Sequence, residues 1–299
     1  MSLFNDILKD LGEKASPIAP EDYIREDGIR MCGKCHTPKE RYLSETQSGK
    51  IDNVLNFFGS DYKIPATCDC MRKRFEAEEQ EAKRRDAAIE AERRRRDCFS
   101  TARDAACTFA LDDRKNPTVS DALLRYAEDF SEMMKREDRF GLLIYGPVGT
   151  GKSFYAACVA NYLLEHGHTA AMTNFTEMVN AIMDRSVDSQ MYIDHLMRKD
   201  LLIFDDMGVE RETEFMQEQV TAFIDARYKS GKPLIVTTNI SLEEIKKPKD
   251  LTYRRMYDRL LEICHPIKVD GKSRRRESVM RTYNERNSLL GLQRREDNA

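Results

Sequence analysis

Apolar and polar positions follow two different patterns along the chain. From about Cys98 onward, apolar runs of four or five residues alternate with stretches whose apolar residues recur every three or four positions. The short runs are typical of buried strands, and the wider spacing is typical of helices that pack one face. Alternation of these two patterns predicts an α/β domain with a parallel sheet.

The individual elements can be placed from the same pattern. The predicted strands lie at 142–145, 169–173, 201–204, 234–238 and 266–269. The predicted helices lie at 116–135, 154–165, 175–183, 212–229 and 251–264. Ser241 and Glu244 have the spacing of a capping box, which predicts one more short helix after residue 240.

The first hundred residues are more polar and show neither pattern at length. Phe4–Leu11 predicts a short amphipathic helix, which either binds a partner or packs on the module that follows. Residues 71–97 are almost all charge and alanine, with ten basic and eight acidic side chains. Charged residues at Glu78 and Arg85 argue against a coiled coil, so we expect a solvated helical linker. The run Arg93–Arg96 either contacts phosphates or belongs to that solvated helix.

Composition narrows the possible classes of function. The chain has 299 residues and a formal net charge of −3, so any contact with nucleic acid must come from a local patch. No apolar run approaches the length of a membrane span, and the first residues do not resemble a signal peptide. We therefore expect a cytoplasmic protein whose eight cysteines stay reduced.

Four of the cysteines form two close pairs, which are Cys32 with Cys35 and Cys68 with Cys70. Two such pairs can supply four thiolates to a tetrahedral Zn²⁺. The second pair is tighter than the usual C-x-x-C, His36 could replace one ligand, and the pairs could also be unligated thiols. The other cysteines are scattered, and this contrast favours a structural zinc site in a small module that needs the metal to fold.

One continuous stretch predicts the main chemistry of the chain. Its residues fit the pattern G-x-x-x-x-G-K-[ST] and are Gly146, Pro147, Val148, Gly149, Thr150, Gly151, Lys152 and Ser153. The stretch lies between a predicted strand and a predicted helix, as a phosphate-binding P-loop requires. Its glycines allow backbone N–H groups to approach phosphates, and the helix N-terminus favours anions. We expect Lys152 to contact the β- and γ-phosphates of ATP and Ser153 to bind Mg²⁺.

Two later strands end in polar residues that suit the same chemistry. The strand at 201–204 is followed by Asp205 and Asp206. Asp205 would hold Mg²⁺ opposite Ser153, and Asp206 would orient or deprotonate the attacking water. Asn239 follows the strand at 234–238 and could bond to the γ-phosphate or the water, although Asn is also a common turn residue.

Together these motifs resemble the DnaC/IstB-like branch of the AAA+ ATPases, specifically replicative helicase loaders of the DnaC and DnaI type. The similarity runs from about Cys107 to Arg276 and rests on the strings GLLIYGPVGTGKSF, LLIFDDMGVE, PLIVTTN and RRMYDRLLEIC. It implies an AAA+ P-loop ATPase core without a full lid domain and identifies Asn239 as sensor 1. Arg255 and Arg259 match the paired arginines of the family, one finger-like and one sensor-like, and the resemblance leaves open which is which.

The resemblance also implies a division of labour along the chain. Residues 1–70 would be a helicase-binding module with the zinc site, 71–97 a charged helical linker and 98–299 the AAA+ ATPase domain. The implied function is ATP-dependent loading of a DnaB-type helicase hexamer onto single-stranded DNA when replication begins. ATP, Mg²⁺ and Zn²⁺ would be the cofactors, the ATPase domain would self-associate, and no membrane would be involved.

Two other functions use a P-loop of this kind. An IstB-like ATPase that assists a DNA transposase would share the core, but such helpers generally lack a comparable cysteine module. A small-molecule kinase would need an acceptor site and a basic lid, and the sequence indicates neither. A basic stretch near the end is either a patch that contacts DNA or a solvated tail, and it comprises Lys272, Arg274, Arg275 and Arg276.

Overall fold

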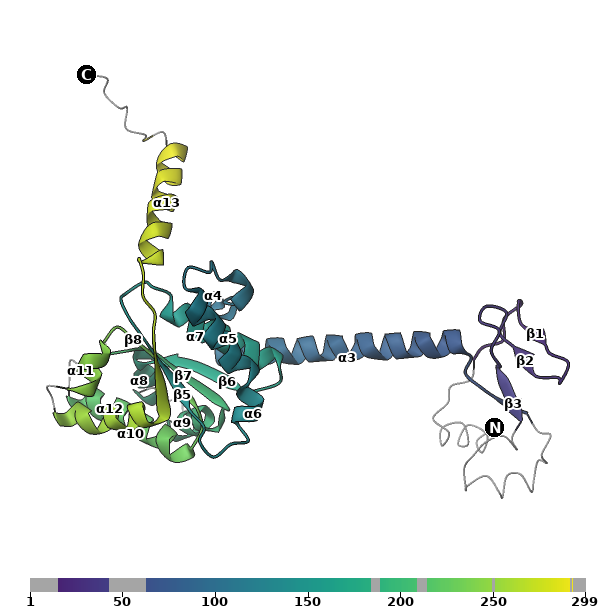
Figure 1. Cartoon of the computed structure of the whole chain (residues 1–299), viewed down its shortest axis with the longest axis horizontal. Coiled ribbons are helices and arrows are strands. Elements are labelled where there is room, and N and C mark those ends of the chain that lie inside the picture. Colours follow the sequence, from purple (N-terminus) through teal and green to yellow (C-terminus); the bar gives the residue numbers. More distant parts are fainter. Residues whose placement is uncertain are drawn as a thin grey trace. The chain divides into compact units, whose positions relative to one another are not determined.

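The computed structural model describes residues 16–42, 63–183, 189–208, 214–248, 251–290 and 292 (Figure 1). The chain divides into two units, Met1–Ala87 and Ala88–Ala299. The amphipathic helix predicted for Phe4–Leu11 lies outside the described residues. Within the described ranges, no helix is both long enough and apolar enough to cross a membrane.

The first unit contains two small antiparallel ribbons. Strand β1 (Tyr23–Ile24) pairs with β2 (Arg30–Met31), and β3 (Glu40–Tyr42) pairs with β4 (Lys63–Pro65). Strands of two or three residues bury little apolar surface, so ribbons of this size need additional contacts to be stable.

A buried ion pair and the cysteines supply such contacts in the first unit. The Nζ atom of Lys39 lies 2.6 Å from Oδ2 of Asp22, and the two side chains are only 6% and 1% exposed. Lys39 also donates to the carbonyl of Pro17 at 2.7 Å. Hydrogen bonds from Lys39 and from the amide of Ala19 hold the pKa of Asp22 at about 2. This pair ties the segment before β1 to the loop before β3.

The helix predicted for 71–97 is present as α3 (Asp69–Cys98). Only Ala91 and Cys98 are buried, which agrees with a solvated helix. Ion pairs along the helix, such as Arg74 with Glu78, join side chains one turn apart and support helices of this composition.

The second unit is built on a five-stranded parallel sheet in the order β6-β7-β8-β5-β9. These strands are β5 (Gly141–Tyr145), β6 (Ala170–Asn174), β7 (Leu201–Met207), β8 (Leu234–Thr238) and β9 (Cys264–Lys268). The predicted α/β fold with a parallel sheet is therefore confirmed. Because β8 lies between β5 and β7, the segments that follow these three strands meet at one edge of the sheet.

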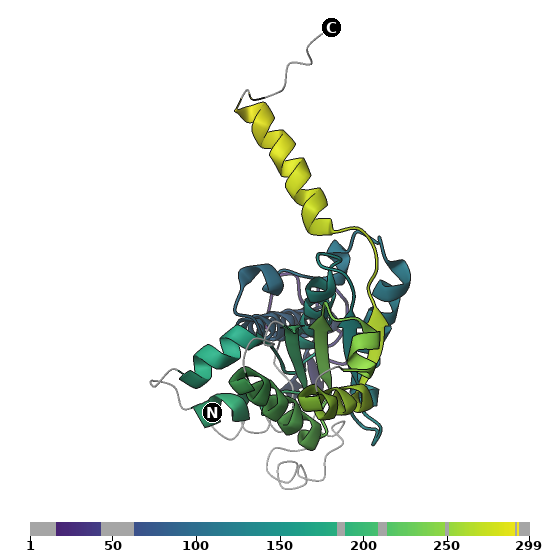
Figure 2. The same cartoon turned by 90° about the vertical axis from the view of Figure 1, so that its left-hand side faces the viewer.

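Helices cover both faces of this sheet and bury a separate apolar core on each side (Figures 1 and 2). Successive strand residues point to opposite faces, so Leu142 and Ile144 join one core while Leu143 joins the other. Helices α5 (Pro117–Glu128) and α7 (Lys152–Glu165) contribute to the first core. The remaining helices are α4 (Ala102–Ala105), η2 (Phe109–Leu111), α6 (Phe130–Met133), α8 (Phe175–Met183), α9 (Ser189–Arg198), α10 (Glu214–Ser230), α11 (Leu242–Lys246), α12 (Leu251–Ile263) and α13 (Arg274–Leu289).

Several features differ from the sequence prediction, and strands β1–β4, α4 and η2 were not predicted at all. The single helix expected at 116–135 is two helices, α5 and α6, separated at Asp129. No Gly or Pro marks the break, so no local signal was available. Helices α9 and α13 were not predicted, and α13 has no described side chain in the core, which removes the apolar stripe that reveals most helices. Strand β7 continues through Asp205 and Asp206 to Met207 instead of ending at 204.

Candidate functional site

The P-loop residues form a tight turn between β5 and α7. Gly149 and Gly151 have φ angles of +82° and +104°, which residues with a Cβ atom rarely adopt. A Cβ atom on Gly149 would also lie 2.2 Å from Oγ of Ser273. Glycine is therefore required at 149 both by the backbone angle and by the close approach of the segment before α13.

Lys152 begins α7, and its side chain reaches back over the turn. Its Nζ donates to the carbonyl oxygens of Gly146 at 3.0 Å and Pro147 at 2.9 Å. A third bond of 2.6 Å goes to Oδ1 of Asn239, the residue that follows β8. Burial lowers the pKa of Lys152, and the two carboxylates of β7 act against this shift. The ammonium group is thus held at the centre of the site by acceptors that a phosphate could replace.

The two carboxylates of β7 occupy different environments. Asp205 is partly buried, accepts a 2.5 Å hydrogen bond from Oγ1 of Thr237 and bonds to Ser153. Burial raises the pKa of Asp205, and these hydrogen bonds act against that effect. Asp206 is exposed and has a φ of +57°, a left-handed conformation that is uncommon for a residue other than glycine.

A chain of hydrogen bonds links Asp206, whose backbone is strained, to the P-loop. The amide of Asp206 donates to Oγ1 of Thr237 at 2.9 Å. Nδ2 of Asn239 donates to Oδ1 of Asp206 at 3.0 Å, while its other end accepts the bond from Lys152. Backbone strain of this kind concentrates at functional sites, where surrounding contacts over-determine the conformation.

These groups surround a cavity of about 690 Å³. The predicted residues that line it are Val148, Gly149, Gly151, Lys152, Ser153, Asp205, Asp206 and Asn239. The other predicted P-loop residues shape the turn itself: the hydroxyl of Thr150 donates to the carbonyl of Pro147 at 2.9 Å, and the carbonyl of Gly146 accepts from Lys152. All of the carboxylate and hydroxyl groups predicted to hold Mg²⁺ therefore face one cavity.

Sequence reasoning missed the contribution of α13 to this cavity. Arg274, expected in a DNA-contacting patch or a solvated tail, turns toward the P-loop and α7 instead. Its backbone amide donates to the carbonyl of Gly149 at 2.8 Å, and its guanidinium donates to the hydroxyl of Tyr155 at 2.9 Å. The same guanidinium lies 3.2 Å from Asp113. A linear run of arginines carries no signal for this inward turn.

Other side chains that no motif marked also line the cavity. They are Arg103, Leu111, Asp113, Phe154, Arg275 and Val279. Leu111, Phe154 and Val279 give the cavity an apolar part beside its charged part. A mixed lining of this kind suits a ligand with an aromatic base and a polyphosphate.

The two arginines expected on α12 lie elsewhere. Neither Arg255 nor Arg259 lines the cavity within the part of the chain that is described. Arg255 is exposed. Arg259 is half-buried, pairs with Asp225 and lies over the ring of Tyr228 at 5.5 Å. A single chain therefore does not bring these arginines to its own Lys152.

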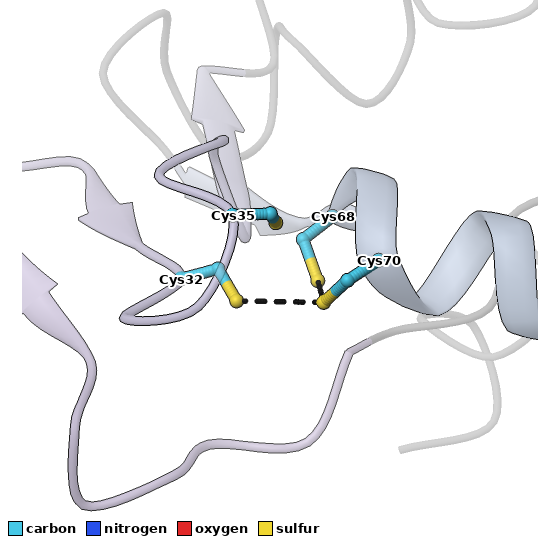
Figure 3. A group of neighbouring side chains, drawn as sticks. All are labelled: Cys32, Cys35, Cys68 and Cys70. Carbon is cyan, nitrogen blue, oxygen red and sulfur yellow. Dashed lines mark hydrogen bonds between the residues drawn. The ribbon is translucent and has the colours of Figure 1, made fainter.

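The two cysteine pairs converge at the junction of the β-ribbons and α3 (Figure 3). The Sγ atoms of Cys32, Cys35, Cys68 and Cys70 all lie within 4.8 Å of one another. Cys32 and Cys70 are 3.6 Å apart, and Cys68 and Cys70 are 3.4 Å apart. His36 is not part of this group, and its ring packs 5.8 Å from that of Tyr23 instead.

The chemistry of the four sulfurs fits a zinc ion. Burial opposes ionisation of Cys35, but hydrogen bonds from Thr37 and from the amide of Cys70 lower its pKa to about 6. The neighbouring thiol of Cys68 raises the pKa of Cys70 to about 12. Thiolates packed this closely repel one another, and a divalent cation would relieve that repulsion while satisfying tetrahedral geometry.

Comparison with known proteins gives a family and several named relatives. The model of the family described as IstB-like ATP binding protein matches residues 85–282. The replicative helicase loader DnaI of Bacillus subtilis is 25% identical over 56% of this chain and 58% of its own length. The loader DnaC of Escherichia coli K12 is 27% identical over 46% of this chain and 54% of its own length. An ATP-binding protein in an insertion sequence of Mycobacterium tuberculosis is 27% identical over 66% of this chain and 78% of its own length.

The match to the two loaders covers a little more than half of their length. Among solved structures, the crystal structure of DnaI is 19% identical, with a TM-score of 0.49 over 59% of this chain and 95% of that one. The crystal structure of the DnaC helicase loader is 18% identical, with a TM-score of 0.49 over 57% of this chain and 100% of that one.

Proposed function

The chain belongs to the family of IstB-like ATP binding proteins, and on this premise we propose that it is a cytoplasmic ATPase that loads a replicative helicase onto single-stranded DNA. One arrangement carries the proposal: Lys152, Asp206 and Asn239 form a connected hydrogen-bond chain in the lining of one cavity. The names of the DnaI and DnaC relatives support the choice of helicase loading.

ATP would bind with its phosphates over the P-loop. Lys152 would exchange its bonds to two carbonyls and Asn239 for bonds to the β- and γ-phosphates. Ser153 and Asp205, already hydrogen-bonded to each other, would hold Mg²⁺, which neutralises charge on the phosphates. This exchange releases Oδ1 of Asn239 from Lys152, and the Nδ2 group of Asn239, which donates to Asp206, is the end that could donate to the γ-phosphate.

Asp206 would act on the attacking water. Asp206 lines the cavity, and its bond from Asn239 holds the carboxylate there while its backbone takes a left-handed conformation. Asn239 contacts both Lys152 and Asp206. Binding of a γ-phosphate at Lys152 would therefore also change the contacts of Asp206, the group that orients the water. Asp206 would then be positioned for hydrolysis only when the γ-phosphate is bound at Lys152.

An arginine of α12 would complete the site of a neighbouring chain. Neither Arg255 nor Arg259 lines the cavity of its own chain, and Arg255 is exposed and available to a partner. Arginine supplied in trans can raise the rate of phosphoryl transfer by about 10³–10⁵. Self-association through the ATPase domain would thus switch on hydrolysis.

The first unit would bind the helicase hexamer. We propose that Cys32, Cys35, Cys68 and Cys70 hold a structural Zn²⁺ that fixes the β-ribbons to the start of α3. The parts of the proposed machine are a zinc-bearing module at 1–70, a helical linker at 71–97 and an ATPase domain at 98–299. Helix α3 spans the proposed linker in one continuous element.

Purification of the full chain from its native host tests this function. The replicative helicase should be recovered with the tagged wild-type chain in the presence of ATP, and the purified pair should transfer helicase onto single-stranded DNA. A Cys32→Ser/Cys35→Ser variant should lose the helicase while it retains ATP binding. Recovery of another partner in place of the helicase would reject helicase loading.

A second function is favoured by one observation. The insertion-sequence relative from Mycobacterium tuberculosis is matched over 78% of its length, more than either loader. This similarity supports an ATPase that assists a transposase on duplex DNA. Recovery of a transposase in the same purification would decide for this alternative.

A further inference from the structure

Helix α13 presents a basic and aromatic side that packing within the chain does not explain. The helix starts beside the P-loop and extends away from the sheet (Figures 1 and 2). None of its described side chains is buried. Its exposed residues must therefore serve solubility or a partner.

Arg276, Tyr283 and Arg286 share one side of α13. Seven residues make almost two helical turns, so Tyr283 lies nearly below Arg276, and Arg286 is one turn further on. Tyr283 is 58% exposed, and both arginines are exposed. The two arginine positions are about 15 Å apart along the axis, with the phenol ring between them.

The arginines of α13 differ from those of α3 in their partners. On α3 several basic side chains form ion pairs one turn away, including Arg74 with Glu78 and Arg93 with Glu90. Among the described residues, neither Arg276 nor Arg286 has an ion pair. The charge of α3 is therefore largely compensated along its own helix, whereas this side of α13 is left positive.

We propose that this side of α13 binds single-stranded nucleic acid. Arg276 and Arg286 would contact separate phosphates, since guanidinium groups bind phosphate oxygens in a bidentate way. Tyr283, between them, would stack on a base, as aromatic side chains do in proteins that bind single strands without sequence preference. The inference rests on the proposed function and adds the surface on which the DNA would lie.

The same helix would couple the binding of single-stranded DNA to the nucleotide site. The first turn of α13 is fixed to the P-loop by the bond from the amide of Arg274 to the carbonyl of Gly149. One turn later, Val279 lines the nucleotide cavity. Single-stranded DNA bound to the far part of α13 would therefore affect the position of the P-loop. We expect such DNA to stimulate hydrolysis through this helix.

Fluorescence anisotropy of the full chain with a labelled thymidine oligonucleotide of about 20 residues tests the surface. Arg276→Ala/Arg286→Ala should weaken binding about tenfold at 0.15 M salt and reduce the slope of log K against log salt by about 1.4. The matched control, Arg74→Ala/Arg93→Ala, removes the same charge from α3 and should bind like wild type. Tyr283→Ala should weaken single-strand binding about fivefold or more, and Tyr283→Phe should retain it.

Several outcomes would overturn the proposal. Equal loss of affinity in the α13 and α3 double variants would show that only net charge matters. An effect of Tyr283→Ala on duplex as large as that on the single strand would exclude base stacking. Loss of helicase binding with unchanged oligonucleotide affinity would make α13 a protein-docking helix instead. The proposed ATPase function is tested separately, because basal hydrolysis should be unchanged in Arg276→Ala/Arg286→Ala and absent in Lys152→Ala.

Discussion

Replacing Asp205 with asparagine should stabilise the protein while it destroys the proposed magnesium site. Asp205 is partly buried, and burial raises the pKa of its carboxyl group because the charged form is poorly solvated. Asparagine has the same shape, can accept the bond from Thr237 and can donate to Ser153. The variant Asp205→Asn therefore removes an unfavourable buried charge and keeps both hydrogen bonds. It also loses the attraction between Asp205 and the ammonium of Lys152, which we expect to be smaller than the gain from removing the buried charge.

The sign of the pH dependence follows from this raised pKa. A carboxyl group whose pKa is higher in the folded state binds more protons there than in the unfolded chain. Its contribution to stability is complete below the unfolded value of about 4 and is lost as the pH rises through the folded pKa. The wild type loses this contribution as the pH rises through the folded pKa, so the advantage of Asp205→Asn should grow from pH 4 upward.

Thermal unfolding with and without Mg²⁺ and ATP measures both effects. For a unit of the size of Ala88–Ala299, each 1 kcal/mol gained without nucleotide raises Tm by about 2–4 °C. Nucleotide at 100 times its Kd should stabilise the wild type by about 2.7 kcal/mol, or about 5–11 °C, and the variant should lose most of this increment. The neighbouring variant Asp206→Asn is the control, because Asp206 is exposed and its replacement relieves no buried charge.

Two results would refute the reasoning. A lower Tm for Asp205→Asn than for wild type at pH 7.5 without nucleotide would mean that the charge at 205 is stabilising. A full Mg²⁺-dependent rise in Tm together with normal hydrolysis would mean that Asp205 does not hold the metal.

Three further predictions concern the remaining parts of the site. Lys152→Ala should abolish hydrolysis and greatly weaken ATP binding, measured by a nucleotide-binding titration, because its ammonium lies over the P-loop carbonyls where the phosphates would bind; hydrolysis at the wild-type rate would reject the P-loop assignment. The wild-type chain should contain about one zinc per molecule by metal analysis, and Cys32→Ser/Cys35→Ser should contain none and keep the second unit folded, whereas full zinc content in that variant would contradict the assignment. Mixing inactive Lys152→Ala with inactive Arg255→Ala or Arg259→Ala should restore part of the activity if one site is built from two chains, and an absence of rescue in variants shown to co-assemble would exclude a shared site.

The two arginine variants should also behave differently when they are tested alone. Arg259 pairs with Asp225 and covers Tyr228, so its loss should lower stability as well as activity. Arg255 is exposed, so its replacement should leave thermal stability within about 0.5 kcal/mol of wild type. The mixing experiment is therefore cleaner with Arg255→Ala.

The sequence by itself determined the features that are encoded locally. The P-loop is one uninterrupted stretch, and its glycines, lysine and serine carry their chemistry wherever the strand and helix beside them are formed. The alternation of apolar runs and helical spacing was sufficient for the α/β class, because residues buried on the two faces of a parallel sheet must be apolar. The close spacing within each cysteine pair indicated the cluster in the same way.

Only the tertiary structure decided which distant residues meet. Asn239 bonds to Lys152, 87 positions earlier, because β8 inserts between β5 and β7, and no local pattern encodes that strand order. The inward turn of Arg274 and the pairing of Arg259 with Asp225 likewise depend on elements packed from separate parts of the chain. Helix α13 was not predicted for a different reason. A helix whose described side chains are not buried leaves no apolar stripe in the sequence, and its role depends on where the fold places it.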